Sequence, residues 1–222
     1  MKKINILKPV LVSNKERALQ NRKLFDRMHS LVINIISSPG AGKTSVIYRV
    51  VERLRARYRI LIIEGDIRGQ VDSQRLKKLK VDVVQINTET ACHLDAYMIA
   101  QALPTSKKKY DLVLVENVGN LVCPAEFEIG EDYKLAILST PEGDDKPFKY
   151  PLLFHLAQVV IINKIDLLSY TDFNLKKAVT QLKKQNPKVR IIVVSAKTGN
   201  GIEEVCDYII EDLNARKKKS HN

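Results

Sequence analysis

The sequence predicts an α/β fold: a single doubly wound, mostly parallel sheet of about seven strands flanked by helices. Short runs rich in Val, Ile and Leu alternate with amphipathic segments from residue 31 onward, which is typical of stacked β-α units around a buried sheet. A small-residue loop, 37–44, joins the first apolar run to a helical pattern. The 222 residues are 45% hydrophobic, enough for the core of one domain, whereas two domains would be crowded.

The first 30 residues are expected to add a helix to this domain. Ser13 with Glu16 predicts a capping box, and Ala18, Phe25 and Met28 recur at helical spacing. The predicted organisation is an N-terminal extension over 1–30, a main domain over 31–215 and a basic, disordered tail over 216–222.

The remaining elements follow from periodicity and from breaks near Pro187 and Gly199. Strands are expected at the short β-branched runs 31–36, 59–63, 81–86, 111–115, 134–139, 158–162 and 190–194. Helices are expected at the amphipathic segments 44–57, 70–79, 92–103, 151–156, 171–184 and 201–213. In such a sheet ligands bind beyond the carboxyl ends of the strands, so the residues after each run are the ones to search for chemistry.

The net charge of +12 raises the question of a nucleic-acid partner. No aromatic residues are interleaved with the basic ones and Trp is absent, so a surface that stacks bases is not expected. No apolar run approaches the roughly 20 residues that span a bilayer. Three cysteines are too few and too odd in number for a disulfide framework. We therefore expect a cytoplasmic protein without a membrane or nucleic-acid partner.

Residues 37–44, Ser-Ser-Pro-Gly-Ala-Gly-Lys-Thr, are typical of a phosphate-binding loop. A strand that ends, a small-residue loop and a helix that begins point several N–H groups and the positive end of the helix at one place. Lys43 adds a cation for the β- and γ-phosphates and Thr44 a hydroxyl for Mg²⁺, while Ser37 stands where the usual motif has its first glycine. The residues expected to bind the phosphates are Gly40, Ala41, Gly42, Lys43, Thr44 and Ser45.

Two further motifs follow the sixth and seventh expected strands, where residues 163–166 are Asn-Lys-Ile-Asp and residues 195–197 are Ser-Ala-Lys. The Asp166 carboxylate can accept from both N1–H and the 2-amino group of guanine, whereas adenine would leave it buried without a partner. The sequence therefore predicts GTP or GDP as the ligand. The residues expected to bind the base or join its loops are Asn163, Lys164, Asp166, Ser195, Ala196 and Lys197.

Carboxylates follow the second and fourth expected strands, at Asp66 and Glu116. Mg²⁺ bound by Thr44 and the phosphates usually takes one or two carboxylates, so both are candidate ligands. Gly119 could donate its N–H to the γ-phosphate. Either acid could instead only cap the neighbouring helix. The residues expected to take part in hydrolysis are Lys43, Thr44, Asp66 and Glu116, and no residue identifies the group that orients the attacking water.

A third candidate site combines Cys92 and His93, after the third expected strand, with Cys123, in the loop after Glu116. Both loops leave the sheet at the same edge, and two thiolates with an imidazole suit Ni²⁺ or Zn²⁺. Three ligands leave one position open for exchange or for a second subunit. The spacing alone is a weak signal, because adjacent helical side chains diverge by roughly 100° and buried free cysteines are common. Cys206 falls on the apolar face of the last expected helix and is interpreted as core.

Together these motifs resemble the hydrogenase nickel-incorporation GTPases, a family in the dimerising, metal-handling class of phosphate-loop GTPases. The resemblance runs from about Asn14 to the last helix. The guanine motifs are shared by many GTPases, whereas Cys-His-Leu-Asp-Ala with Asn-Leu-Val-Cys-Pro is specific to this family. The residues that carry the resemblance are 37–44, 64–66, Asp72 with Arg75, 92–96, 116–124 and 142–147.

The resemblance implies a P-loop NTPase fold and a GTP-hydrolysing protein that helps to insert nickel into [NiFe] hydrogenase. It also implies a homodimer that forms on GTP binding, with Cys92, His93 and Cys123 as metal ligands at the interface. The implied cofactors are GTP or GDP, Mg²⁺, and Ni²⁺ or Zn²⁺. The implied partners are a small nickel chaperone of the same pathway and the precursor of the hydrogenase large subunit.

Three other functions remain open at this point. A related accessory GTPase for urease or a cobalamin enzyme would share the guanine motifs but lack the Cys-His-Leu-Asp-Ala and Asn-Leu-Val-Cys-Pro pair. A basic GTPase that binds RNA or the ribosome would use the charge of +12 and would show steeply salt-dependent RNA binding. A passive metal-binding protein with a vestigial nucleotide site would not hydrolyse GTP, so turnover that Lys43→Ala abolishes would exclude it.

Overall fold

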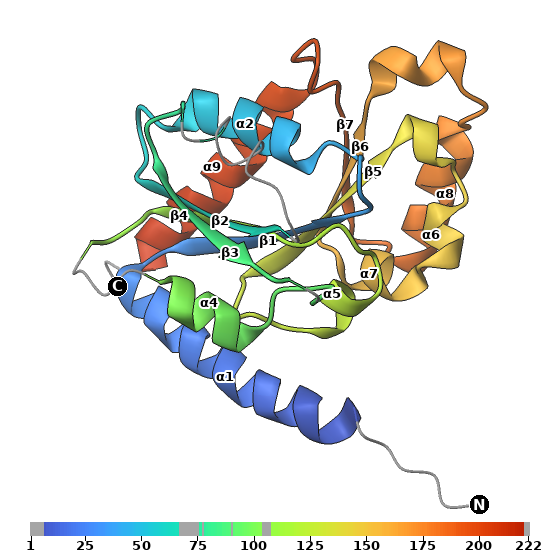
Figure 1. Ribbon diagram of the computed structural model, residues 1–222. Helices are drawn as coiled ribbons and strands as arrows, with labels where there is room; N and C mark the ends of the chain where they lie inside the picture. The colour runs from blue at the N-terminus through green and yellow to red at the C-terminus, as the bar shows by residue number, and fades with distance from the viewer. Residues whose placement is uncertain (1–6, 67–75, 77, 90, 104–107, 220–222) are drawn as a thin grey trace, which may run out of the picture.

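Seven short strands rich in Val, Ile and Leu pair in parallel in one sheet (Figure 1). The computed structural model describes residues 7–66, 76, 78–89, 91–103 and 108–219, and within them the side chains other than those of 7–9, 66 and 219. The strands are β1 Leu31–Ser37, β2 Ile60–Asp66, β3 Asp82–Asn87, β4 Leu112–Glu116, β5 Tyr133–Ser139, β6 Val159–Asn163 and β7 Arg190–Val193. Their order is β3-β2-β4-β1-β5-β6-β7. The predicted fold class and the seven predicted strands are therefore confirmed.

Strand β1 lies in the middle of the sheet, between β4 and β5. The chain continues from β1 towards β2 and β3 on one side, and from β5 towards β7 on the other. The carboxyl end of β1 is therefore a topological switch point, where parallel sheets bind ligands. Side chains of β1 are buried on both faces of the sheet, with Val32 and Ile36 on one face and Ile33 and Ile35 on the other, each at most 4% exposed.

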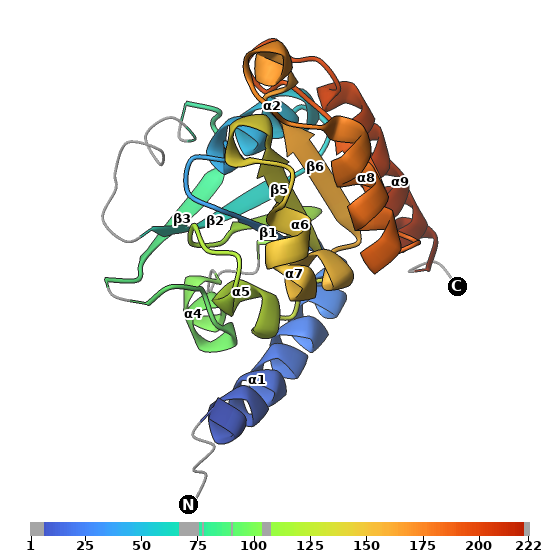
Figure 2. The same cartoon turned by 90° about the vertical axis from the view of Figure 1, so that its right-hand side faces the viewer.

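Helices cover both faces of the sheet (Figure 2). One face packs against α2 and α9, and the other against α1, α4, α5, α7 and α8. The long helices are α1 Leu7–Met28, α2 Lys43–Leu54, α8 Leu175–Gln185 and α9 Ile202–Lys219. The short ones are α4 Ala96–Ala102, α5 Cys123–Glu126, α6 Lys146–Lys149, α7 Pro151–Leu156 and the 3₁₀ turns η1 Thr140–Glu142 and η2 Ile165–Tyr170.

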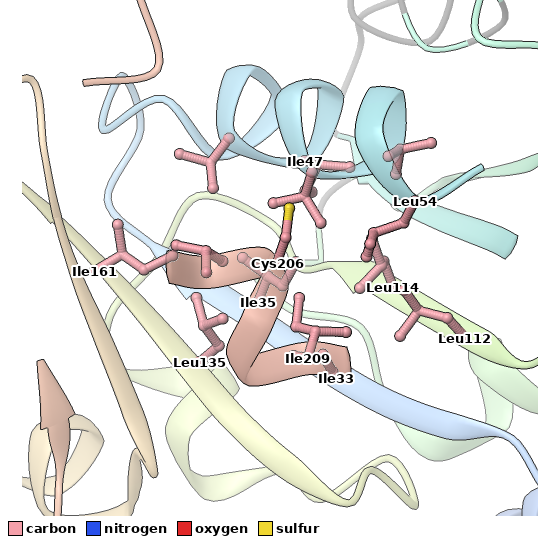
Figure 3. Packing of buried hydrophobic residues seen from close by; sticks show 14 of the residues in the cluster. Ile33, Ile35, Ile47, Leu54, Leu112, Leu114, Leu135, Ile161, Cys206 and Ile209 are labelled. Atoms are coloured by element: carbon pink, nitrogen blue, oxygen red, sulfur yellow. The ribbon is translucent and has the colours of Figure 1, made fainter. Parts of the chain in front are cut away.

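The core between the sheet and helices α2 and α9 contains the thiol of Cys206 (Figure 3). Cys206 is 4% exposed and packs in one cluster with Ile35, Ile47 and Ile209. Burial raises the pKa of this thiol to about 11, so it stays protonated and unreactive at neutral pH. The interpretation of Cys206 as a core residue is confirmed.

Two helix starts differ from the predictions. Helix α1 begins at Leu7, so Ser13 lies inside it, where its hydroxyl is bonded to the Tyr97 hydroxyl at 2.9 Å, and the predicted capping box is wrong. Helix α4 begins at Ala96 instead of residue 92, because Asp95 is its N-cap and accepts a hydrogen bond from the N–H of Met98.

The C-terminal end also differs from the prediction. Residues 216–219, predicted to be part of a disordered basic tail, continue α9, and residues 220–222 lie outside the described residues. Arg216 donates to the Ser30 carbonyl at 2.6 Å and pairs with Asp132. The tail prediction is therefore wrong for Arg216, because its charge is paired against the end of α1 and the start of β5.

Some predictions fall on residues that the structure does not describe. These are most of the helix expected at 70–79, together with Asp72 and Arg75.

Helix α8 begins at Leu175, four residues later than expected, where the Asn174 side chain accepts from the Lys177 N–H. Of the helices in the described ranges, none combines the length and the apolar character that crossing a membrane needs.

Candidate functional site

The phosphate loop follows β1 at the middle of the carboxyl edge of the sheet. Helix α2 begins at Lys43, so the N–H groups of its first turn face the loop. Gly42 precedes the helix with a φ of 94°, a left-handed conformation that side chains disfavour. Lys43 is 8% exposed and its Nζ donates to Ser37 Oγ at 3.0 Å. The serine that replaces the first glycine of the motif thus binds the lysine expected to bind phosphate.

A cavity of about 380 Å³ opens beside this loop and contains carboxylates from β2 and β4. Thr44 Oγ1 donates to Glu116 Oε1 at 2.7 Å, and Glu64 on β2 is in register with Glu116 on β4. Glu64 and Glu116 are 2% and 6% exposed. Hydroxyl and carboxylate oxygens this close together, beside a phosphate loop, fit Mg²⁺. The side chain of Asp66, the other predicted ligand, lies outside the described residues.

The loop after β4 lies directly against the phosphate loop. A Cβ atom added to Gly119 would lie 3.0 Å from Pro39 Cγ and 3.1 Å from Pro39 Cα, so only a hydrogen fits there without a shift. Both residues line the same cavity as Lys43 and Thr44. A movement of the phosphate loop at Pro39 would therefore press on the loop after β4 at Gly119.

Two side chains at the carboxyl end of β6 bond to the phosphate loop. Asn163 Nδ2 donates to the Ala41 carbonyl at 2.9 Å, and Asn163 Oδ1 accepts from the Ala196 N–H at 3.1 Å. Lys164 Nζ donates to the Gly40 carbonyl at 2.6 Å. Asn163 therefore joins the loops that follow β1, β6 and β7.

Asp166 and Ser195 lie together at the far side of these loops. Ser195 Oγ donates to Asp166 Oδ1 at 2.5 Å. The loop of Ala196 and Lys197 is fixed from α2, because Arg49 Nε donates to the Ala196 carbonyl at 3.0 Å and Arg49 Nη2 to the Lys197 carbonyl at 3.1 Å. The predicted base-binding residues are thus brought to one place from two loops.

A second cavity, of about 460 Å³, adjoins these base-side residues. It shares Gly42 and Ser45 with the cavity beside the phosphate loop. Asn163, Lys164 and Asp166 line it. Most of the residues expected to bind the phosphates thus line one cavity, and most of the residues expected to bind the base line the cavity next to it.

The two thiols and the imidazole lie together on the neighbouring loops. The possible ligand atoms of Cys92, His93 and Cys123 lie within 4.8 Å of one another, and Cys92 Sγ is 3.7 Å from His93 Nδ1. Sulfur ligands of a tetrahedral ion at 2.3 Å are roughly 3.8 Å apart, so a small closure of the cluster would hold one ion. Because Cys92 and His93 precede α4, the divergence expected of adjacent helical side chains does not apply to them. The donor set fits Ni²⁺ or Zn²⁺.

The protonation of this cluster follows from its surroundings. The Cys123 thiol has a raised pKa because it is hydrogen-bonded to Cys92 and is partly buried. Burial lowers the pKa of His93 against the opposing effect of Asp95, so the ring is neutral at neutral pH and can bind a metal ion. A metal ion that binds here must displace the thiol protons.

Three buried polar residues in the site received no role from the sequence. Glu64 and Asn117 line the phosphate cavity with Glu116, and Asn117 Nδ2 donates to Asn34 Oδ1 at 3.0 Å. A signal was present in each case, because a charged or amide side chain within or directly after an apolar run needs a partner once it is buried.

Known proteins match this arrangement over most of the chain. The family model described as CobW/HypB/UreG, nucleotide-binding domain, matches residues 31–193. The hydrogenase maturation factor HypB of Azotobacter vinelandii is 43% identical over 207 residues, which cover 93% of this chain and 68% of that protein.

Two solved structures extend the likeness to three dimensions. The crystal structure of HypB from Helicobacter pylori in complex with nickel has a TM-score of 0.86 at 33% identity, over 91% of this chain and 96% of that one. HypB from Archaeoglobus fulgidus has a TM-score of 0.86 at 36% identity, over 91% of this chain and 99% of that one. This chain therefore belongs to the CobW/HypB/UreG family of P-loop nucleotide-binding proteins, among its HypB hydrogenase maturation factors.

Proposed function

We propose that this chain is a GTP-hydrolysing metallochaperone whose nucleotide state sets its affinity for nickel, which it delivers during the maturation of [NiFe] hydrogenase. The observation that carries the proposal is the loop of residues 116–123. This loop borders the phosphate cavity at Glu116 and Gly119 and begins α5 with the thiol of Cys123. A change of contact at the γ-phosphate would therefore move a metal ligand.

The nucleotide would be bound by residues that already lie in place. Lys43 would exchange its bond with Ser37 for the β- and γ-phosphates, and Asp166 would accept from the guanine edge. Thr44 and Glu116 would hold Mg²⁺, which neutralises the phosphate charge when bound. In hydrolysis the oxygen of a water molecule bonds to the γ-phosphorus as the bond to the β–γ bridging oxygen breaks, which gives GDP and phosphate.

Nickel is the cargo in this proposal, and Cys92, His93 and Cys123 would fill only part of its coordination sphere. Cys92 is exposed, Cys123 is half-buried, and three ligands leave a coordination position open. A second copy of the chain, docked across the nucleotide edge in the GTP state, would cover this position. Nickel would arrive from a small nickel chaperone and leave for the precursor of the hydrogenase large subunit.

Nickel titrations test the coupling. Ni²⁺ is added to the chain saturated with GDP and to the chain saturated with a non-hydrolysable GTP analogue. Coupling between two binding sites typically changes an affinity by about 5- to 150-fold, so a difference in that range is expected. Equal nickel affinities in the two forms would contradict the proposal.

Turnover and assembly need separate measurements. Lys43→Ala is expected to slow phosphate release from GTP by roughly 100-fold or more, as the loss of a group that stabilises transition-state charge does elsewhere. Lys188→Ala, on the exposed surface, is the control. Sedimentation with the GTP analogue is expected to show a dimer, and a monomer at all concentrations would remove the dimer from the proposal.

A further inference from the structure

A buried carboxamide joins the phosphate cavity to the metal cluster. Asn117 Oδ1 accepts from the Leu94 N–H at 2.9 Å and from the Val118 N–H at 3.0 Å. Leu94 directly follows His93, and Val118 directly precedes Gly119. Asn117 is fully buried, with an exposed fraction of 0%. One buried oxygen atom therefore accepts hydrogen bonds from backbone N–H groups of both loops.

The other end of this carboxamide is fixed to the central strand. Asn117 Nδ2 donates to Asn34 Oδ1 at 3.0 Å, and the Asn117 N–H donates to the Ile35 carbonyl, also at 3.0 Å. Asn34 is fully buried and its Nδ2 donates to Glu131 Oε1 at 3.3 Å. Strand β1 continues into the phosphate loop, so Asn117 is anchored to the element on which the nucleotide would sit.

The same chain of contacts returns to His93 from its other side. Lys134 Nζ donates to Glu131 Oε1 at 2.5 Å and to the Phe127 carbonyl at 3.2 Å. The Phe127 ring stacks on the His93 ring, with their centroids 3.9 Å apart and their planes inclined by 38°. His93 is therefore held by Asn117 through the N–H of the next residue, Leu94, and by Phe127 through its ring.

We propose that Asn117 is a positioning residue that transmits the position of the phosphate-side loop to the metal ligand His93. If Val118 moves with Gly119 towards a γ-phosphate, Asn117 Oδ1 must follow it or leave a buried N–H without an acceptor, which is costly. When the oxygen follows, the Leu94 N–H follows it, and His93 moves with Leu94. This inference rests on the coupling of nucleotide and nickel proposed above and names the residue that carries it.

The test compares nickel affinities in the two nucleotide states. Ni²⁺ is titrated into the full chain with GDP and with the GTP analogue, for the wild type and for Asn117→Ala, and GDP affinity is measured in parallel. Loss of residues that support metal ligands weakens binding by about 10- to 100-fold, so weaker nickel binding is expected in at least one state. The ratio of the two affinities is expected to fall to about one, with GDP affinity retained.

Matched variants separate coupling from stability. Asn21 is also a buried asparagine, 3% exposed, and its Nδ2 donates to the carbonyls of Ala96 and Ile129, which lie outside residues 116–124. Asn21→Ala is expected to keep the wild-type ratio. Asn117→Asp retains an acceptor for both N–H groups and is expected to keep more of the ratio than Asn117→Ala. If Asn117→Ala does not fold, Asn34→Ala removes the anchor instead and is expected to move the ratio towards one.

The outcomes distinguish this inference from the proposed function. A wild-type ratio of one would overturn the coupling, and the role of Asn117 with it. A wild-type ratio far from one that persists in Asn117→Ala, or in Asn34→Ala where that variant is used, overturns the role of Asn117 alone. A ratio that falls equally in Asn21→Ala would also overturn it, because general loosening of the fold would then explain the effect.

Discussion

The guanine-side loops, residues 163–166 and 195–197, and the metal-side loops, residues 91–95 and 116–124, lie at the same edge of the sheet but are held differently. On the guanine side, Asn163 and Lys164 bond directly to the phosphate loop, and Ser195 bonds to Asp166. On the metal side the two loops meet at the side chain of Asn117, and the possible ligand atoms of Cys92, His93 and Cys123 lie within 4.8 Å of one another.

This difference separates recognition from response. The guanine-side contacts already hold their loops against the phosphate loop, so nucleotide binding needs little rearrangement there. The metal cluster depends on the relative position of two loops, and one of them also borders the phosphate cavity. A nucleotide would therefore be recognised on one side of β1 and would have its effect on the other.

The largest expected effect is confined to the metal side. Cys123→Ser is expected to weaken Ni²⁺ binding by at least about 100-fold, because even residues that only support a metal ligand contribute 10- to 100-fold. GDP affinity is expected to be retained. Calorimetric titration with each ligand measures both. Cys206→Ala is the matched control, since that thiol lies in the core, and equal loss of nickel binding in the two variants would contradict the assignment.

Gly42→Ala breaks the contact between the phosphate loop and the guanine side. The new Cβ would lie 2.6 Å from Asn163 Nδ2, and the residue would keep a φ of +94°. Such strain is about 1–3 kcal/mol, so with the displaced Asn163 a loss of GDP affinity of roughly 100-fold is expected. Gly40→Ala is the control, because its φ is +78° but nothing lies within 4 Å of the added atom. Equal losses in both variants would show that the Asn163 contact is irrelevant.

Asp166→Asn should alter the guanine side alone. A hydrogen bond to a charged group contributes about 1.5–3 kcal/mol, so GDP affinity is expected to fall by roughly 10- to 100-fold while nickel affinity stays unchanged. Xanthosine diphosphate carries a carbonyl where guanine has its amino group, so the variant is expected to bind it better than the wild type does. Asp172→Asn, on the exposed surface nearby, is the control. Unchanged base preference would refute the role of Asp166.

The smallest effect concerns β3, the outer strand on the metal side. Hydrogen bonds from Lys108 and Tyr110 lower the pKa of Asp82. Because this pKa is lowered, the ion pair of Asp82 with Lys108 stabilises the fold above a pH of about 4. That stabilisation is lost as the pH falls through the pKa of Asp82 in the folded protein. Because the pair is largely exposed, Asp82→Asn is expected to reduce the free energy of unfolding by less than about 1 kcal/mol at pH 7. Urea unfolding at pH 7 and pH 3 measures this, and a difference that grows at pH 3 would contradict the sign.

The sheet could be predicted from the sequence because its inner strands, such as β1, β4, β5 and β6, are buried on both faces and therefore appear as continuous apolar runs. The helix ends could not, because they depend on single caps. The periodic pattern predicts a helix from residue 92, but Asp95 is the N-cap and α4 begins after it. Asn174 is likewise the N-cap of α8 and delays its start. The sequence does not reveal the role of Arg216, because its partners, at the end of α1 and the start of β5, are distant in the sequence.

The candidate site divides in a similar way. Residues 37–44, 163–166 and 195–197 form motifs whose spacing identifies them, and the structure brings them to one edge of the sheet. The roles of Glu64, Asn34 and Asn117 could not be predicted in this way. Their roles depend on which strands are neighbours and in what register, for instance Glu64 beside Glu116, and short segments do not contain that information.

Because Cys206 is buried, the reactivity of the other two thiols can report how much of the protein has metal bound. Of the three thiols, one is sealed in the core with a pKa of about 11, whereas the other two both belong to the metal cluster. A thiol-reactive dye applied to the native protein at neutral pH therefore counts Cys92 and Cys123, and bound metal would shield both. The fraction of unlabelled protein then follows metal loading directly, in any nucleotide state, without an engineered probe.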